Sequence, residues 1–227
     1  RRQRQMCIRD RGETECRTTI RRTRGGGKVC SQALACQARE KRKDLFYGWY
    51  DLGGVQEAPI MAIYQSRYKT RFILSRFPVV TYHAMITFIP RVKLNEIQLK
   101  ALLAFLNSSF SQLYIESVGR TTGAVGPIGL EVKHAEQLPV LDVRKLKQED
   151  LECLAHLFDK LEYKARNIGG ADSLDSIEKL WEGIIKEIDI EMTRILKLPK
   201  ELADSARKLA RLMMNRRLQR AEEALPE

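Results

Sequence analysis

The chain has 227 residues, 44 % of them hydrophobic, and its formal net charge is +11. This length accommodates one sizeable core or two small ones. The sequence contains neither an uncharged apolar run of about 18 residues nor a secretory signal pattern, so we expect no membrane association and a cytoplasmic location.

The positive charge is concentrated near the N-terminus. Residues 1–48 contain 14 Lys and Arg against 5 Asp and Glu, whereas residues 141–227 contain 17 against 18. A basic excess indicates an anionic partner such as nucleic acid. The opening RRQRQMCIRDR resembles translated sequencing-adapter read-through, and the residues after it are rich in Arg, Thr and Gly. We therefore expect residues 1–44 to be a disordered or artefactual basic lead-in, and the chain to be the C-terminal part of a longer protein.

Four runs of β-branched and aromatic residues follow the lead-in. They comprise residues 58–64, 70–75, 78–83 and 84–90. Pro59, Pro78 and Pro90 mark their edges, because proline cannot donate to a β-ladder. These runs predict a small mixed or antiparallel sheet with a basic loop, QSRYKTR, at residues 65–71.

A helical region comes next. Leucines and aromatic residues recur at three- and four-residue spacing from Leu99 to Tyr114, after a capping pair formed by Asn95 and Gln98. The polar stretch at 107–109 can end one helix and cap another, which predicts a helix–kink–helix.

Three further apolar stripes at helical spacing occupy the last third of the chain. They are Leu151, Leu154, Phe158, Leu161 and Ala165; Ile177, Trp181, Ile184 and Ile188; and Leu202, Ala206, Leu209 and Met213. The pattern predicts an α+β fold, with an α+β domain over residues 45–145 and a C-terminal helical segment over residues 146–227.

Patterns for catalysis are sparse. The chain has no [DNS]-P-P-[YF] motif, no G-x-x-x-x-G-K-[ST] loop and no H-E-x-x-H motif. Its five cysteines are odd in number and form no closely spaced pair, so we expect free thiols and no metal. The segment Glu131-Val132-Lys133, downstream of Glu116, is an E-x-K pattern. Metal-dependent nucleases use an acidic residue followed by such a pattern to hold a divalent ion, so the segment resembles part of a nuclease site. The same alternation also describes the wet face of a strand whose Val132 points inward.

Four glycines and a proline occur within eleven residues after the first helical region. Gly119 suits a helix C-cap, and Gly123 and Gly126 permit positive φ and close backbone approach. Arg120 projects from this segment, and arginine offers a bidentate fork to phosphate or guanine. Two interpretations stay open: a loop that contacts nucleic acid, or a tight turn packed under other elements.

The segment ALLAFLNSSFSQLYIESVGRTTGAVGPIGLEVKHAEQLPV resembles the target-recognition region of adenine-specific DNA methyltransferases from restriction–modification systems. The resemblance is closest to the TaqI-like specificity domain of single-chain, Type IIG-like enzymes. There, a helix ending in Leu-Asn-Ser leads into a Gly-Arg, glycine-rich loop, a strand and a Leu-Pro-[IV] turn. The matching residues here are Leu106-Asn107-Ser108, Gly119-Arg120 with Gly123 and Gly126, and Leu138-Pro139-Val140. Roughly residues 44–222 take part in the resemblance.

The resemblance implies sequence-specific recognition of double-stranded DNA, with the N-terminal methyltransferase domain of the same parent chain as partner. S-adenosylmethionine and catalysis belong to that missing domain, so we expect no cofactor and no catalytic residue in this fragment. The expected DNA-binding residues are Gly119, Arg120, Gly123 and Gly126; the loop residues Arg67, Tyr68, Lys69 and Arg71; and Arg76, Arg91 and Lys133. Two alternatives stay open: a structural or interaction module without DNA contact, and a metal-dependent nuclease that uses Glu131 and Lys133.

Overall fold

The computed structural model describes residues 41–42, 58–79, 84–121, 126–169 and 173–223. The chain divides into two compact units, Arg1–Gln56 and Glu57–Glu227, and nearly all the described residues belong to the second. Apart from residues 41 and 42, the predicted lead-in lies outside the described residues.

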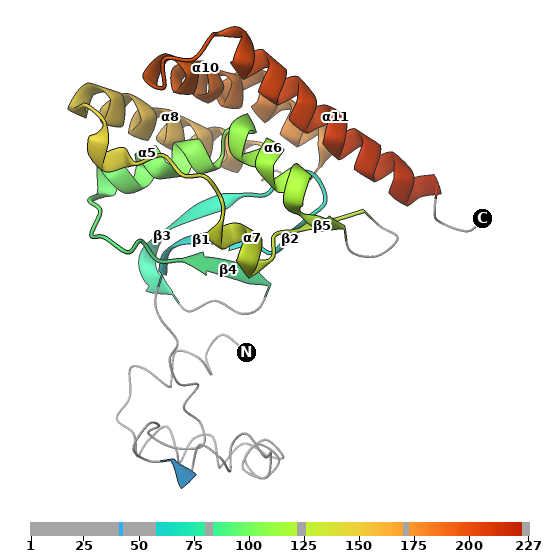
Figure 1. Ribbon diagram of the computed structural model, residues 1–227, viewed down its shortest axis with the longest axis horizontal. Coiled ribbons are helices and arrows are strands. Elements are labelled where there is room, and N and C mark those ends of the chain that lie inside the picture. The colour runs from blue at the N-terminus through green and yellow to red at the C-terminus, as the bar shows by residue number, and fades with distance from the viewer. Residues whose placement is uncertain (1–40, 43–57, 80–83, 122–125, 170–172, 224–227) are drawn as a thin grey trace. The chain divides into compact units, whose positions relative to one another are not determined.

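An antiparallel sheet forms one layer of this unit (Figure 1). Its three strands, in the order β3-β1-β4, are β3 (Phe72–Val79), β1 (Ala58–Ile63) and β4 (Met85–Phe88). Along β1, buried residues alternate with partly exposed ones, because successive side chains of a strand point to opposite faces. The α+β class and the antiparallel sheet are thus as predicted from the alternating runs.

Strand β3 differs from the prediction, which placed a strand edge at Pro78. Ala58 pairs with Val79 and Ile60 pairs with Leu74, so four residues of β3 lie opposite Pro59 alone. A proline needs no ladder partner for its nitrogen, and an irregular stretch of this kind accommodates it. One irregular strand therefore continues through Pro78, and the rest of the run predicted at 78–83 lies outside the described residues.

Helices α5 (Glu96–Leu106) and α6 (Ser109–Val118) lie on one face of the sheet (Figure 1). The capping box of Asn95 and Gln98 is present, and Ser108 caps α6 by accepting a hydrogen bond from Ser111 N. The predicted helix–kink–helix is confirmed, with the kink at the polar residues because they offer the chain side-chain partners in place of helical ones.

Asn107, at this kink, fastens the helix pair to the edge of the sheet. Its Oδ1 accepts from Phe72 N at 3.2 Å, and its Nδ2 donates to Phe72 O and Leu103 O, each at 2.9 Å. The side-chain amide therefore satisfies both backbone groups of Phe72, as a neighbouring strand would.

Four helical elements make up the C-terminal part: α8 (Gln148–Asn167), α9 (Leu174–Leu180), α10 (Lys186–Ile195) and α11 (Glu201–Glu223). A π-helical turn, η2 (Trp181–Ile185), joins α9 to α10 around the irregular backbone of Gly183. The first two predicted apolar stripes are largely buried.

The third predicted stripe is wrong at its two leucines. Ala206 is buried as predicted and Met213 is partly buried, but Leu202 and Leu209 are exposed, and Ala203 and Ala210 are buried in their place. The small alanines let α11 approach its neighbours closely, which larger leucines on that face would prevent.

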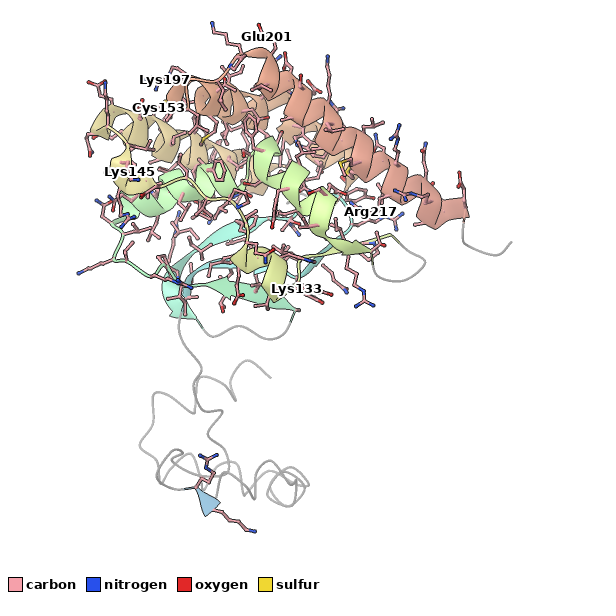
Figure 2. The ribbon with its side chains drawn as sticks, viewed as in Figure 1. Lys133, Lys145, Cys153, Lys197, Glu201 and Arg217 are labelled. Atoms are coloured by element: carbon pink, nitrogen blue, oxygen red, sulfur yellow. The ribbon has the colours of Figure 1, made fainter. Side chains whose placement is uncertain are left out.

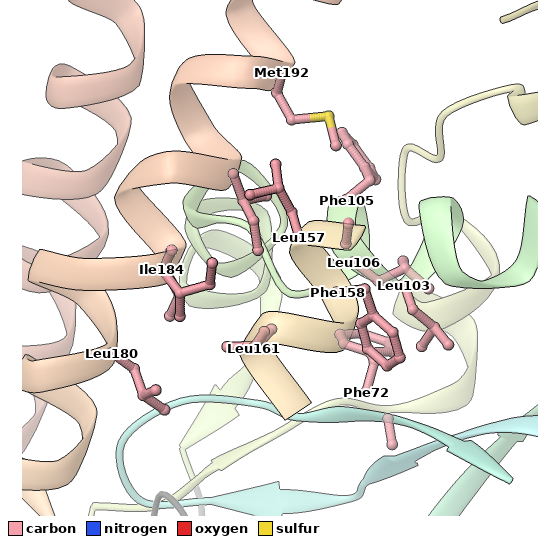
Figure 3. Close-up of a cluster of buried hydrophobic side chains, with 14 of the residues drawn as sticks. Phe72, Leu103, Phe105, Leu106, Leu157, Phe158, Leu161, Leu180, Ile184 and Met192 are labelled. Carbon is pink, nitrogen blue, oxygen red and sulfur yellow. The ribbon is translucent and has the colours of Figure 1, made fainter. Parts of the chain in front are cut away.

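One core runs across the predicted boundary at residues 145 and 146. Figure 3 shows Phe72 of β3, Leu103 and Phe105 of α5, Phe158 of α8 and Met192 of α10 in a single cluster of buried side chains. The helical segment therefore covers the helix pair and the sheet as part of the same packed unit. Within the described residues, no helix combines the length and apolarity needed to cross a membrane.

Candidate nucleic-acid interface

The glycine-rich segment begins where α6 ends, at Gly119. Its backbone is extended, with φ −65° and ψ 147°, so Gly119 caps the helix without a left-handed turn. A Cβ atom on this residue would lie 2.5 Å from Ile128 Cγ1 and 2.6 Å from the Ile115 carbonyl oxygen. Glycine is required here because the helix end and the following hairpin lie so close together.

After Gly119 the chain forms a second small sheet, in the order β2-β6-β5. Its strands are β2 (Gln65–Ser66), β6 (Ile128–Gly129) and β5 (Arg120–Thr121). Arg120 pairs with Gly129, and Gln65 pairs with Gly129 on the other side. This sheet joins the basic loop after β2 to the glycine-rich segment, two regions that the sequence placed far apart.

Gly126 holds the far end of the segment against α11. Its φ is +74°, a left-handed value that favours glycine, and a Cβ atom there would lie 2.8 Å from Ala221 Cβ. Gly123, the remaining predicted glycine of the interface, lies outside the described residues. Both interpretations of the glycines therefore receive some support, since the described ones pack tightly and still leave Arg120 at the surface.

A buried ion pair braces this arrangement. Arg217 of α11 donates Nε to Glu116 Oε2 at 3.0 Å and Nη2 to Glu116 Oε1 at 2.9 Å. Its Nη1 donates to the carbonyl oxygen of Arg67 at 3.0 Å and to that of Gly126. Arg217 is 5 % exposed, and such a pair costs much to break because the remaining charge stays buried. One guanidinium thus ties α6, the basic loop and the glycine segment to α11.

Arg120 itself points away from this brace. Its side chain is 74 % exposed, and its Nη1 lies 3.6 Å from Glu131 Oε1. Lys133 Nζ lies 3.3 Å from the other oxygen of the same carboxylate. The Lys133 ammonium, and then the Arg120 guanidinium, hold the pKa of Glu131 below its usual value. The predicted residues Arg120 and Lys133 therefore share one carboxylate and leave a net positive charge at the surface (Figure 2 labels Lys133).

The E-x-K segment has a different structure from the predicted strand. Val132 begins a short helix, α7 (Val132–Glu136), and is 61 % exposed instead of pointing inward. Leu130, fully buried, takes the inward position. Glu131 is paired with cations, Glu116 is paired with Arg217, and the described part of the chain contains no group of three or more potential metal ligands. These contacts give no support to a nuclease site.

The predicted residues of the basic loop differ in how far they are buried. Arg67 is exposed and lies 3.8 Å from Glu222 of α11, with its guanidinium 6.0 Å from the Tyr68 ring centre. Tyr68 packs against the core. Lys69 is only 4 % exposed, and burial lowers its pKa to about 8. We remove Lys69 from the candidate interface, because its amine is turned into the protein interior.

The remaining predicted cations lie on other elements. Arg76 of β3 is exposed and lies 3.4 Å from Glu162 of α8, and Arg71 lines an apolar pocket with residues of α8. Arg91 is exposed in the loop after β4. The structure therefore groups Arg67, Arg120 and Lys133 around the glycine segment and places Arg71 and Arg76 against α8.

A hollow of about 460 Å³ lies between the glycine segment and α11. Gly119, Thr121, Gly126 and Ile128 line one side, and Met213, Arg216, Arg217, Arg220 and Ala221 line the other. Arg216 and Arg220 are exposed. Sequence reasoning missed both, because it averaged the charge of residues 141–227; the local run RRLQR, without an acidic residue, is the signal that could have found them.

The comparisons with known proteins leave the chain without a family assignment. No family model, no curated protein and no solved structure matches it.

Proposed function

We propose that this chain is a region that recognises a short sequence in double-stranded DNA, as the specificity part of an adenine-specific DNA methyltransferase of a restriction–modification system. The methyl transfer would belong to a separate catalytic domain of the parent protein, with its S-adenosylmethionine. This proposal combines the sequence resemblance described above with the arrangement of cations around the glycine segment.

The observation that carries the proposal is Arg120 on its braced hairpin. The side chain is 74 % exposed, while Gly119 before it and Gly126 after it are held in tight contacts. A long cationic side chain on a fixed backbone can reach a phosphate or a base edge without ordering a loop first. Lys133 shares the Glu131 carboxylate with Arg120 and adds positive charge beside it, and the exposed Arg67 follows β2 of the same small sheet, paired with Glu222.

The Leu-Asn-Ser residues hold the helix that leads to Arg120. Asn107 completes the backbone hydrogen bonds of Phe72, and Ser108 caps α6, the helix that leads to Arg120. The motif therefore has a structural role in positioning the hairpin relative to the sheet. A helix–kink–helix that holds a cationic loop at its end is a suitable scaffold for recognition, because binding residues work best on a rigid support.

The test is selection of the full chain on a randomised duplex pool, with Arg120→Gln and Arg144→Gln beside the wild type. Arg144 is a matched control, since it is also exposed and also paired with a nearby carboxylate, Asp142. We expect the wild type and Arg144→Gln to enrich one short motif, with affinity that falls as salt rises. Arg120→Gln should bind that motif roughly tenfold or more weakly, as for a lost charge-assisted contact.

Absence of binding by the wild type would reject this function in favour of an interaction module. Equal weakening by Arg120→Gln and Arg144→Gln would instead show that the hairpin is not the contact. Magnesium-dependent cleavage of the pool, lost in Glu131→Ala, would support the nuclease alternative.

A further inference from the structure

The arginines in the C-terminal half of α11 have different partners. Arg217 is buried and its guanidinium is occupied by Glu116 and two backbone carbonyls. Arg216 and Arg220 are exposed, and among the residues that the structure describes no carboxylate pairs with either guanidinium; Arg220 Nε donates to the backbone carbonyl of Arg216 at 3.2 Å. They are four residues apart, so they lie on one face of the helix, about 6 Å apart along its axis.

Both exposed arginines line the hollow beside the glycine segment. Glu116 also lines it, but its carboxylate is neutralised by the buried Arg217, so the two exposed guanidiniums determine the charge of the hollow. On the opposite wall, Thr121 is exposed, and Gly119 and Gly126 add neither a side chain nor a negative charge. The hollow is therefore built for an anionic group.

We propose that Arg216 and Arg220 form a phosphate clamp, through which α11 holds the backbone of the DNA that the glycine segment approaches. This inference rests on the proposed function and extends it, because the C-terminal helix then belongs to the interface. The DNA backbone is the expected occupant because the hollow presents two exposed guanidiniums that no described carboxylate neutralises, next to the hairpin on which Arg120 is exposed. Cationic clamps of this kind position a duplex.

A phosphate fits the hollow better than a base edge. Reading a base requires donors and acceptors arranged to match its edge, as with arginine on guanine or asparagine on adenine. Among the described residues that line the hollow, the exposed charged groups are the two guanidiniums, and the Glu116 oxygens are taken by Arg217 and Gln112. Two guanidiniums on adjacent helix turns supply positive charge and donors but no acceptor, which suits the phosphate oxygens of a duplex of any sequence; a guanine contact by either arginine would instead weaken only the enriched duplex.

The experiment compares Arg216→Gln/Arg220→Gln with Lys200→Gln/Lys208→Gln in the full chain. Both pairs remove two exposed positive charges. Lys200 directly precedes α11 and Lys208 lies in its first half, at the end of the helix that Figure 2 marks with Glu201. Fluorescence anisotropy would measure the affinity for the enriched duplex and for an unrelated duplex over a series of salt concentrations. Thermal unfolding would check that each variant stays folded, as expected for surface substitutions.

For the arginine variant we expect roughly tenfold or greater weakening on both duplexes and a salt slope smaller by about 2, one for each lost phosphate contact. The lysine variant should keep the wild-type slope. A slope unchanged in the arginine variant, or a loss confined to the enriched duplex, would overturn the clamp while leaving the proposed function in place. A wild-type chain that binds neither duplex would overturn both.

Discussion

At Gly119 the end of α6 lies so close to β6 that the position has no room for a side chain. The nearest atoms to a Cβ would be Ile128 Cγ1 at 2.5 Å and Ile115 O at 2.6 Å, one of them a backbone oxygen that cannot rotate away. Gly129, its neighbour in the same hairpin, has its closest atom, Arg120 O, at 3.5 Å, an ordinary contact. Two glycines of one motif therefore differ in what they tolerate.

We predict that Gly119→Ala lowers the free energy of unfolding by about 1–3 kcal/mol, as for other overpacked sites, and displaces Arg120. Gly129→Ala should change that free energy by less than about 1 kcal/mol, since the added methyl group meets no short contact. Urea unfolding followed by circular dichroism measures both. Equal costs at the two positions would show that the hairpin can shift to accept a side chain.

At the scale of the element, α11 has two faces with different roles. Ala203, Ala206 and Ala210 meet the neighbouring helices, while Leu202 and Leu209 are exposed. Arg207 and Arg217 are buried on the packed face and pair with Asp189 and Glu116. On α11, two leucines are therefore exposed and two arginines are buried, the reverse of the usual pattern. Close contact between helices leaves room only for alanine, and the buried arginines are stabilised by their carboxylate partners.

Adjacent residues on α11 test this assignment of faces. Ala210→Leu should reduce the free energy of unfolding by about 1–3 kcal/mol, because Ala210 is fully buried and a larger side chain forces the helices apart. Leu209→Ala should change it by no more than about 0.5 kcal/mol, because Leu209 is 46 % exposed. If chemical denaturation shows a larger loss of stability for Leu209→Ala than for Ala210→Leu, the predicted apolar stripe is the packed face after all.

At the scale of the whole molecule, Asp189 of α10 connects α6 with α11. Its carboxylate accepts from Ser109 N at 2.8 Å and Ser109 Oγ at 2.6 Å, and Arg207 Nη1 lies 3.5 Å away. Burial raises the pKa of Asp189 to about 6, against the favourable effects of Ser109, Arg207 and Lys69. A carboxyl with a raised pKa stabilises the folded protein most below its unfolded pKa, where it is protonated in both states, and loses that contribution as pH rises through 6.

We predict that wild type loses roughly 3 kcal/mol of unfolding free energy relative to Asp189→Asn as pH rises from about 3 to about 7. Asp175→Asn is the control, because Asp175 is exposed and its ion-pair partner among the described residues is Lys179. Urea titrations across this pH range, analysed as differences between variants, give the result. Parallel curves for wild type and Asp189→Asn would mean that Asp189 titrates normally.

The buried Lys69 acts in the opposite pH range. Burial lowers its pKa from 10.5 to about 8, so its contribution is present above pH 10.5 and is lost as pH falls through 8. Together, Asp189 and Lys69 depress stability most between about pH 6 and 8, where both are charged in the interior. Burying Asp189 and Lys69 where the helix pair α5–α6 packs on the C-terminal helices therefore lowers the stability of the protein near neutral pH.

The sequence by itself determined the features that depend on neighbours along the chain. The capping pair of Asn95 and Gln98, the kink before Ser109 and the antiparallel strands follow from local hydrogen bonding and from the two-residue period of a strand. The class of fold could be predicted for the same reason. Arg120 could be singled out because glycine and arginine stand next to each other at a helix end.

Only the tertiary structure decided which cations are free to bind a partner. Arg216 and Arg217 are adjacent and identical in type, yet one is exposed and the other is buried against Glu116. Lys69 and Arg67 stand in one basic loop, and only Arg67 reaches the surface. Burial depends on contacts between residues far apart in the sequence, such as Glu116 and Arg217 with a sequence separation of 101, and no local pattern of charge or hydrophobicity encodes those contacts.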